Sequence, residues 1–500
     1  MKTVLNRFVV LAALSAVTLP LCAALEWNVP APCVTRDGDT LTVTVGKNVK
    51  NAWNTMARAT VDLAPFAGKA VDVSIRCRGE DVSAPRETWL GLKVMLHLKN
   101  ADGSDAYPQA GRKTGTFGWT TLSFHCDIAD PAPKEASLAL GLQSATGTAV
   151  FDLSSLKIEE SAPLFVMTNR DYRIKYPDEI RAKKPRRGVM LPERAPTEDD
   201  FKTLHAWGAT LARFQIVRGW GETDGNQDLD EYDRWLDGRL DDLEKTLPLA
   251  EKYGIELVVD LHVPPGGRDA GNDMNMFYDA RFADRFVACW KRIATRFAGR
   301  KGIFGFDLIN EPTQTRRALP DCDYWNLQRR AAEAVRAIDP KTPIIIESND
   351  WDSSSGFRYL SPLAMDNVIY QAHLYDPHQF THQGVGGRWN RTKWPDAEKG
   401  WNREFLRKTL EPVLEFRRRH DARIYIGEFS AITWGEGAGD YIADCIALFE
   451  EYGFDWTYHA FREWNGWSVE HQVADPVDAR RLVPSEDNPR KRALLSGLRR

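Results

Sequence analysis

Apolar and polar residues follow one pattern in the amino-terminal part of the chain and another in its larger, carboxyl-terminal part. From about residue 187, short apolar runs typical of buried parallel strands alternate with stretches whose apolar residues recur every three to four positions. Leu236, Leu240, Leu243 and Leu247 have this helical spacing, as do Phe282, Phe286, Trp290 and Ile293. The strand candidates are Gly188–Leu191, Ala209–Ile216, Ile255–Leu261, Ile303–Ile309, Pro343–Glu347, Val368–His373, Ile424–Gly427 and Trp456–Phe461. Eight strand–helix units in succession predict a (β/α)8 TIM barrel of the α/β class.

The amino-terminal part shows the two-residue alternation of half-buried strands and almost no helical periodicity. Its clearest runs are Thr40–Val45, Ala70–Ile75, Leu92–Leu98 and Thr120–His125, separated by Gly, Pro and Asp clusters. This pattern predicts an antiparallel β-sandwich. We therefore expect a leader over residues 1–24, an all-β sandwich domain over residues 25–161 and the barrel domain over residues 162–500.

Residues 1–24 have the composition of a secretory signal. Lys2 and Arg7 form a positively charged start, and an apolar run follows as far as Leu21. Cys22 and Ala24 supply small residues before a cleavage site. A lipid anchor on Cys22 is the weaker alternative, because Leu21 is bulky where such anchors need a small residue. We therefore expect a secreted protein, either extracellular or periplasmic, without a membrane span.

Charge and cysteine content narrow the choice of partners and of stabilising chemistry. The net charge of −4 becomes −6 without residues 1–24, which hold two basic residues and no acid. No basic face is implied, so nucleic acid is not an expected partner. Six cysteines remain after the leader, three in each expected domain, so we expect at most one disulfide per domain. Cys-x-x-Cys spacing and phosphate-cradling glycine loops are absent, so we expect no metal and no cofactor.

Two of the predicted barrel strands end in glutamate. One finishes with Asn310-Glu311-Pro312 and the other with Gly427-Glu428-Phe429. Chemistry in a (β/α)8 barrel takes place at the carboxyl ends of the strands. A single glutamate there would most simply cap its strand, but two on one rim can face each other across a cleft. Glycoside hydrolysis needs such a pair, with one acid protonated for the leaving oxygen and the other ionised for attack.

With these motifs, the segment from about Arg187 to Trp467 resembles the family 5 glycoside hydrolases of the cellulase superfamily (clan A). The resemblance implies that Glu311 is the acid/base and Glu428 the nucleophile of a retaining, double-displacement reaction. It further implies that Arg213 keeps the nucleophile ionised and that His262 contacts substrate. A bridge from Arg213 to some other surface acid, and a purely structural role for His262, are the simpler alternatives.

The resemblance also assigns residues near the ends of strands four, six and eight. Asn310 would bind the sugar 2-hydroxyl, His373 would support the acid/base, and the Tyr375 hydroxyl would bind the nucleophile. Trp464 would form the aromatic floor beneath the sugar, with Trp467 as its competitor. Glu463 adds a carboxylate without an assigned role. Further tryptophans that could line a cleft or anchor loops are Trp220, Trp351, Trp389, Trp394 and Trp434.

The β-rich part resembles the jelly-roll, galactose-binding-like domains attached to many polysaccharide-degrading enzymes. The runs that carry this resemblance are 119–122, 138–142 and 149–153. It implies a carbohydrate-binding-module-like domain with Trp53, Trp89, Tyr107 and Trp119 as a stacking surface. The same aromatic residues could instead be core.

Together these resemblances imply a secreted endo-β-glycanase of the β-1,4-glucanase type that acts as a monomer on β-linked polysaccharide or oligosaccharide. A β-mannanase or an exo-acting β-glucosidase on the same scaffold is an alternative, since loops decide among these substrates. The rival from another class is a carbohydrate-binding protein whose barrel has lost catalysis.

Overall fold

The structure is a computed structural model that describes residues 25–500, apart from residues 31, 48–54, 86–89, 102–104, 111–112, 130, 163, 166–167, 219–223, 270, 386–390, 476–477 and 479. The expected leader, with Cys22, and four of the tryptophans named above, Trp53, Trp89, Trp220 and Trp389, lie outside the described residues. The chain divides into two compact units with their boundary at residues 166 and 167.

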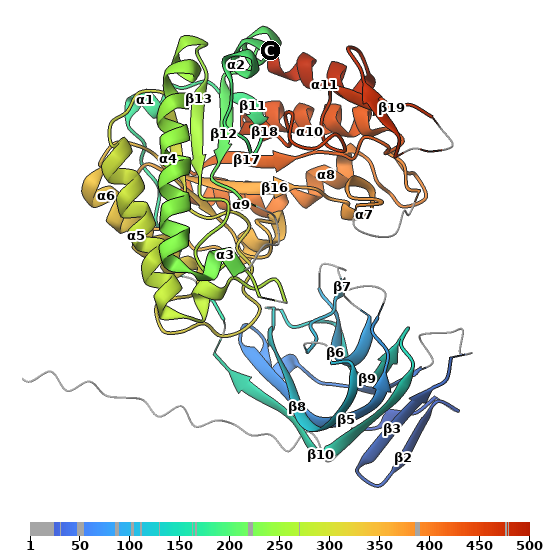
Figure 1. Ribbon diagram of the computed structural model, residues 1–500. Helices are drawn as coiled ribbons and strands as arrows, with labels where there is room; N and C mark the ends of the chain where they lie inside the picture. The colour runs from blue at the N-terminus through green and yellow to red at the C-terminus, as the bar shows by residue number, and fades with distance from the viewer. Residues whose placement is uncertain are drawn as a thin grey trace, which may run out of the picture. The chain divides into compact units, whose positions relative to one another are not determined.

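The amino-terminal unit contains two five-stranded antiparallel sheets, ordered β1-β4-β9-β6-β7 and β2-β3-β10-β5-β8 (Figure 1). Its strands are β1 (Trp27–Asn28), β2 (Val34–Asp37), β3 (Thr40–Val45), β4 (Met56–Thr60), β5 (Ala70–Val82), β6 (Gly91–Lys99), β7 (Asp105–Ala106), β8 (Gly115–Asp127), β9 (Glu135–Gln143) and β10 (Gly147–Ser161). Each of the four runs expected as strands lies within one of them. Alternate residues of both sheets share one apolar core, including Leu41, Val73, Leu96 and Leu138. The predicted β-sandwich is therefore confirmed.

The carboxyl-terminal unit is a closed barrel of eight parallel strands in chain order. The strands are β11 (Arg187–Met190), β12 (Leu211–Gln215), β13 (Glu256–Asp260), β14 (Ile303–Asp307), β15 (Ile344–Glu347), β16 (Val368–Leu374), β17 (Arg423–Phe429) and β18 (Asp455–Tyr458). All eight expected strands are present, and the predicted TIM barrel is confirmed. The last strand ends at Tyr458, three residues before the predicted end, so the segment after it is a loop.

Helices between the strands cover the outside of the barrel, as the ribbon of α4, α5 and α6 shows (Figure 1). They are α1 (Asp178–Arg181), α2 (Glu198–Trp207), α3 (Asp224–Gln227), α4 (Leu229–Lys252), α5 (Ala280–Phe297), α6 (Tyr324–Ile338), α7 (His378–Thr381), α8 (Arg403–Thr409), α9 (Glu411–His420), α10 (Ala438–Tyr452) and α11 (Pro489–Leu498). The four leucines of α4 and the four apolar residues of α5 that predicted these helices are buried. Asp228 caps α4 by accepting from the amides of Asp230 and Glu231.

Short elements complete the described part of the chain: the 3-10 turns η3 (Ala64–Phe66), η4 (Asn275–Phe277) and η5 (Ser354–Tyr359), and the hairpin β19 (His471–Val473) with β20 (Leu482–Pro484). The six cysteines within the described residues are all unpaired thiols. A helix with the length and apolarity to cross a membrane is not found among the described residues.

Candidate active site

The carboxyl ends of the barrel strands gather a set of polar side chains around one arginine. Arg213, on β12, is fully buried. Its Nη1 donates to Glu428 Oε1 at 2.6 Å, its Nε to Asp307 Oδ2 at 3.0 Å, and its Nη2 to Glu347 Oε1 at 3.1 Å. Asp260 Oδ2 lies 3.3 Å from the same Nη2. The sequence predicted the contact with Glu428, but not that one guanidinium would also serve three acids from β13, β14 and β15.

One positive charge cannot balance four ionised carboxylates away from water, so these acids differ in protonation. Burial raises the pKa of Asp307 to about 7 against the opposing charge of Arg213. Burial also raises the pKa of the neighbouring Asp352 well above its ordinary value. Asp307 Oδ1 and Asp352 Oδ2 have no hydrogen-bond partner among the described residues, which leaves space for a proton on each. Burial acts on Glu428 in the same direction, but the facing histidines and Arg213 outweigh it and lower its pKa.

Glu311 follows β14 with a backbone φ of +51°. Such a conformation costs a residue other than glycine on the order of 1–3 kcal/mol, so neighbouring contacts must hold it. The Glu311 amide donates to Glu347 Oε2 at 2.6 Å, and its carbonyl accepts from Arg268 Nη2 at 2.7 Å. Arg268 itself lies over the Trp351 ring, 4.6 Å from its centroid. Glu347 therefore contacts both Arg213 and the backbone of the predicted acid/base.

His373, on β16, lies between Glu311 and Gln371. Its Nδ1 is 2.9 Å from Glu311 Oε1, and its Nε2 is 3.3 Å from Gln371 Nε2. An amide nitrogen can only donate, so His373 Nε2 accepts and Nδ1–H donates to Glu311. Gln371 also donates to Glu347. It packs so closely on Gly427 that a Cβ there would lie 2.5 Å from its amide carbon. The glycine before Glu428 thus leaves space for the amide that orients His373.

The two predicted catalytic glutamates face each other. One carboxylate oxygen of Glu311 and one of Glu428 lie within 4.8 Å. Retaining glycosidases place their two carboxyl groups roughly 5–5.5 Å apart, whereas inverting enzymes separate them by ~6.5–9.5 Å. The side chains are 14% and 5% exposed, so both are largely shielded from water. This approach of one oxygen from each acid favours the closer spacing of the retaining class.

Tyr375, just beyond β16, contacts the second oxygen of the predicted nucleophile. Its hydroxyl lies 2.8 Å from Glu428 Oε2 and 2.5 Å from His459 Nδ1. His459 Nε2 lies 3.2 Å from Glu463 Oε1. The unassigned carboxylate of Glu463 is therefore a partner of His459, a residue that the sequence analysis did not single out.

Asn310 is held beside Glu311 by a second set of hydrogen bonds. Its Oδ1 accepts from Arg213 Nη2 at 3.0 Å, so its Nδ2 faces His262 Nε2 at 3.2 Å. His262 Nδ1 donates to Asp260 Oδ2 at 2.8 Å. His262 is 7% exposed and supports the Asn310 amide. Its contact with substrate remains a prediction.

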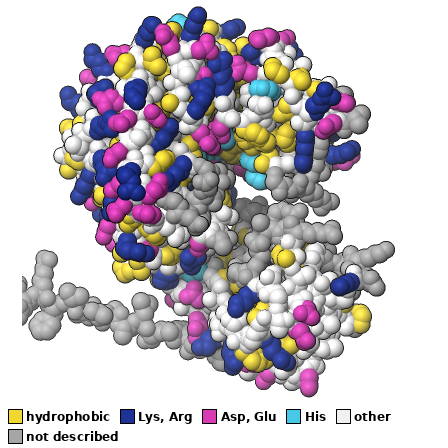
Figure 2. Space-filling model, viewed as in Figure 1, with side chains coloured by type: hydrophobic (Ala, Val, Ile, Leu, Met, Phe, Trp, Pro, Cys, Tyr) yellow, Lys and Arg dark blue, Asp and Glu magenta, His cyan; other side chains and the backbone are white. Residues whose placement is uncertain are grey.

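Trp464 and Trp467 both belong to an aromatic group near Glu428. Trp467 is 7% exposed, and its ring lies 5.8 Å from that of His459 and 6.3 Å from that of Tyr375. Trp464 is 43% exposed and lies 5.7 Å from Trp467. Trp467 therefore adjoins the residues around the nucleophile, and Trp464 extends the aromatic surface toward solvent. On the face seen in Figure 2, histidines lie among hydrophobic side chains of the barrel unit.

Of the other described tryptophans, Trp434 lies 6.0 Å from Trp464, and Trp351 lies beneath Arg268. Trp394 is 3% exposed and packs against Phe380 and Tyr441, so it does not line a cleft.

Two groups of side chains have atoms close enough to hold a metal ion: Glu311 with His373 and Glu428, and Glu347 with Asp352 and His373. Both depend on His373, whose ring nitrogens are occupied by Glu311 and Gln371. Both oxygens of Glu428 are occupied as well, by Arg213 and Tyr375. Hydrogen bonds within the protein thus account for the ligand atoms of the first group, whereas Asp352 Oδ2 of the second group has no hydrogen-bond partner among the described residues.

The sequence analysis missed Asp307, Glu347, Gln371 and His459 as parts of the site. A signal for the first three was present, because each is a polar residue inside an otherwise apolar strand. A buried polar side chain needs a partner, but the pattern does not say which one. His459 also lay inside the predicted strand Trp456–Phe461, but the structure places it in the loop just after β18.

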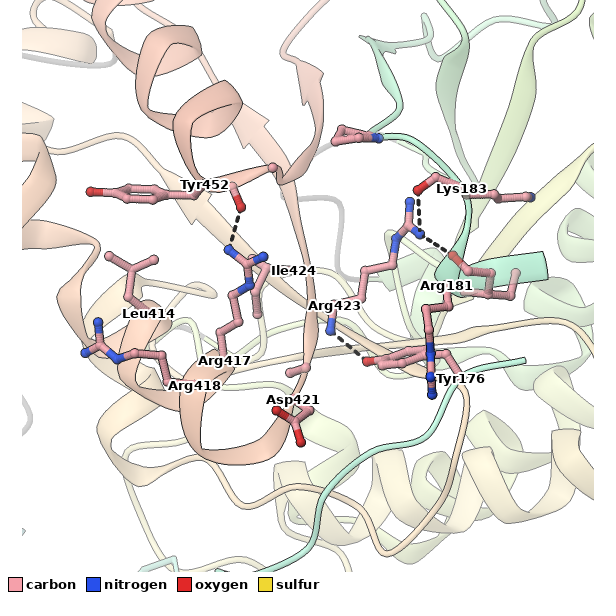
Figure 3. A pocket seen from close by; sticks show the side chains of 14 residues that line it. Tyr176, Arg181, Lys183, Leu414, Arg417, Arg418, Asp421, Arg423, Ile424 and Tyr452 are labelled. Atoms are coloured by element: carbon pink, nitrogen blue, oxygen red, sulfur yellow. Dashed lines mark hydrogen bonds between the residues drawn. The ribbon is translucent and has the colours of Figure 1, made fainter. Parts of the chain in front are cut away.

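A cavity of about 610 Å³ lies at the other end of the barrel, where β17 begins at Arg423 (Figure 3). Its basic side chains are Arg181, Lys183, Arg417, Arg418 and Arg423, and Asp421 is its acid. Most of this charge is already used within the chain. Arg423 pairs with Asp455, Lys183 with Glu256 and Arg418 with Glu411, and Arg417 donates to the Tyr452 carbonyl. The cavity lacks a pair of facing acids and is separate from the site around Glu428.

Comparisons with known proteins agree with this geometry. A family model described as Cellulase (glycosyl hydrolase family 5) matches residues 182–465. Endoglucanase C of Acetivibrio thermocellus is 30% identical over 296 residues, which cover 52% of this chain and 83% of that protein. Cellodextrinase A of Ruminococcus flavefaciens is 27% identical over 249 residues, which cover 47% and 68% of the two chains. A solved structure described as a glycoside hydrolase shares the barrel fold, with a TM-score of 0.52, 20% identity and coverage of 63% and 99%.

The parallel barrel with two facing glutamates at its carboxyl rim defines a glycoside hydrolase. More specifically, the chain belongs to glycosyl hydrolase family 5, the cellulase family, whose model matches more than half of its residues. The resemblance inferred from the sequence motifs is confirmed.

Replacement of Arg213 tests its role as the shared cation. We expect Arg213→Met to lower the free energy of unfolding at pH 8 by about 3–5 kcal/mol, because it leaves buried acids without their counter-charge. The acids of the variant have raised pKa values when folded, so the folded state binds extra protons at low pH and loses stability as pH rises. In the wild type, the lowered pKa of Glu428 contributes stability that is already complete above the ordinary glutamate pKa, so this contribution changes little from pH 5 to pH 8. The difference between the two proteins should therefore grow from pH 5 to pH 8.

Urea unfolding at both pH values measures this difference. Arg281→Met is the control, because Arg281 is 74% exposed and pairs with Asp279 at the surface. It should change stability by less than about 0.5 kcal/mol. An Arg213→Met difference as small as the control, or one that shrinks with rising pH, would contradict the role.

Proposed function

We propose that the protein is a secreted, retaining endo-β-glucanase that cleaves internal β-1,4 bonds by double displacement. The observation that carries the proposal is the approach of Glu311 and Glu428 to within 4.8 Å at the carboxyl rim of the barrel, in different surroundings. Arg213 and facing histidines favour the ionised form of Glu428, as a nucleophile requires.

In the first step, Glu428 attacks the anomeric carbon while Glu311 gives its proton to the leaving oxygen, so the glycosidic bond breaks and a glycosyl-enzyme forms. Arg213 and Tyr375 hold the two oxygens of Glu428 and orient the attack. In the second step, Glu311 takes a proton from water, and the hydroxide oxygen replaces Glu428 at the anomeric carbon. Asn310, oriented by Arg213, would bind the 2-hydroxyl of the sugar in both steps.

Two relatives support a β-glucan as the substrate class: one is named an endoglucanase and the other a cellodextrinase. The exposed ring of Trp464 and its neighbour Trp434 support an extended cleft, because flat aromatic faces stack on sugar rings. A β-mannanase or an exo-acting β-glucosidase would use the same two glutamates. The complete set of residues around Glu428 weighs against a binding protein without catalysis.

We propose that residues 25–161 form a carbohydrate-binding-module-like domain beside the catalytic domain of residues 162–500. Tyr107 and Trp119 are 49% and 46% exposed, which supports a role in stacking on sugar. Neighbours occupy part of each ring: His97 stacks on Tyr107 at 4.7 Å, and Arg76 lies 5.5 Å from the centroid of Trp119. Pull-down on insoluble β-glucan, comparing Glu428→Ala with Glu428→Ala/Trp119→Ala, measures the contribution of Trp119. Equal binding by the two variants would contradict a contribution of Trp119 to sugar binding.

Residues 1–24 support secretion through their positive start and apolar run. Amino-terminal sequencing of the exported protein would show a start after Ala24. Acidic and basic side chains are interspersed over the face seen in Figure 2, which supports a lack of affinity for nucleic acid on that face, and the monomeric state stays a prediction.

Replacing each glutamate tests the assignment of roles. We expect Glu428→Ala to lower kcat by at least about 10³-fold, and Glu311→Ala by about 10²–10⁴-fold. Azide should restore turnover in both variants with opposite stereochemistry. It would attack in place of Glu428 to give an α-glycosyl azide, and would attack the glycosyl-enzyme of Glu311→Ala to give a β-glycosyl azide.

NMR of the azide products and steady-state kinetics measure these outcomes. Glu333→Ala is the control, because Glu333 pairs with Arg329 on the surface of α6. It should leave kcat unchanged. A near-normal kcat in either active-site variant, or the same azide anomer from both, would remove the assignment.

Product profiles on cellohexaose, mixed-linkage β-glucan, mannohexaose and xylohexaose test the substrate. We expect short cello-oligosaccharides from cellohexaose and an early fall in the viscosity of β-glucan, because internal bonds are cut. Faster cleavage of mannohexaose would favour the mannanase, and release of glucose alone would favour the exo-acting enzyme. Binding of the panel without new reducing ends would favour the non-catalytic rival.

A further inference from the structure

The hydrogen bonds of Tyr375 extend beyond Glu428, the proposed nucleophile. Its hydroxyl contacts Glu428 Oε2 at 2.8 Å and His459 Nδ1 at 2.5 Å. His459 Nε2 contacts Glu463 Oε1 at 3.2 Å, and the other oxygen of Glu463 accepts from Gln215 Nε2 at 2.7 Å. A continuous line of hydrogen bonds thus runs from β12, through the loop after β18, to the carboxylate of the nucleophile.

Which group donates and which accepts in each of these hydrogen bonds depends on how many protons the His459 ring carries. With two, Nε2–H donates to Glu463 and Nδ1–H donates to the Tyr375 oxygen. The single hydroxyl hydrogen of Tyr375 is then left to donate to Glu428. With one proton, held on Nε2 by Glu463, Nδ1 becomes an acceptor and competes with Glu428 for that hydrogen.

We propose that His459 and Glu463 are positioning residues for hydrolysis, in which the doubly protonated His459 ring, anchored by Glu463, directs the Tyr375 hydrogen to Glu428. The proposal rests on the proposed function of Glu428 as the nucleophile. When His459 loses one proton, the Tyr375 hydroxyl donates to His459 Nδ1 instead of to Glu428. Glu428 Oε2 then loses this hydrogen-bond donor, while Oε1 keeps its contact with Arg213.

The charges around His459 favour the doubly protonated ring. Burial opposes it, but Glu428 on β17, Glu463 in the loop after β18 and Glu311 after β14 outweigh burial and raise the pKa of His459 to about 9. His382, just after α7, faces the same group, and burial lowers its pKa well below the ordinary value, so it adds no competing charge at neutral pH. The remaining face of the ring packs on Trp467.

The first experiment observes His459 directly, without activity. The protein contains ten histidines, so ¹⁵N-histidine NMR is practicable, and His459→Gln identifies the signals of this ring. We expect both ring nitrogens of His459 to be protonated at pH 7 in the wild type. In Glu463→Gln, the ring should lose its second proton at a lower pH. A singly protonated ring at pH 7 in the wild type, or an unchanged titration in Glu463→Gln, would overturn the proposal.

The second experiment measures the pH dependence of kcat/KM with 2,4-dinitrophenyl β-cellobioside. Its leaving group needs no proton, so the alkaline limb does not report the acid role of Glu311. Relative to wild type, Glu463→Gln should lose activity as pH rises, by about twofold between pH 6 and pH 8 for a fall of one in the pKa of His459 from its value of about 9, and by more at higher pH. Adding Tyr375→Phe should abolish this dependence, because no hydroxyl hydrogen remains to be directed.

Glu470→Gln is the matched control, because Glu470 lies in the same loop but pairs with Arg462. Its profile should follow that of the wild type. A Glu463→Gln variant that loses activity equally at every pH would reveal a merely structural role and overturn the proposal. If the wild type fails to cleave the cellobioside, the proposed function fails instead, and the NMR titration still decides the state of His459.

Discussion

The site depends on one buried guanidinium shared among four carboxylates. Arg213 contacts Asp260, Asp307, Glu347 and Glu428, which come from four different strands. In a region without water, one cation forces these acids into different protonation states. Burial drives Asp307 toward its neutral form, whereas Glu428, which also faces histidines, stays ionised. Arg213 therefore joins four strands of the barrel and also favours the ionised form of Glu428 at their carboxyl ends.

The same network of hydrogen bonds also positions Glu311, the residue that faces Glu428. Glu347 contacts Arg213 with one oxygen and accepts from the Glu311 amide with the other. The left-handed backbone of Glu311 is held by this bond and by Arg268. Glu428 and Glu311 are thus supported from one cluster, which explains how two acids in different surroundings can approach to within 4.8 Å.

The loop after β18 adds to the site a contact that the sequence motifs did not predict. The expected aromatic residues Trp464 and Trp467 lie in this loop. The loop residue that is connected to Glu428 by hydrogen bonds, however, is His459, which contacts the Tyr375 hydroxyl and packs on Trp467. An ionisable ring in this position makes the orientation of a catalytic hydrogen bond depend on pH. A purely apolar ring there could not do so.

The sequence by itself determined the two folds, all eight barrel strands and the two glutamates that face each other, because strand and helix periodicity is local and a strand end is marked by the residues that follow it. It also pointed to Arg213, His373 and Tyr375 through the motifs they share with a family. Only the tertiary structure decided that Asp307, Glu347 and Gln371 lie around Arg213, that Trp394 is buried, and that His459 joins Glu463 to Tyr375. These contacts join residues from different strands and loops, and barrel closure and loop conformation, which no local pattern encodes, bring them together.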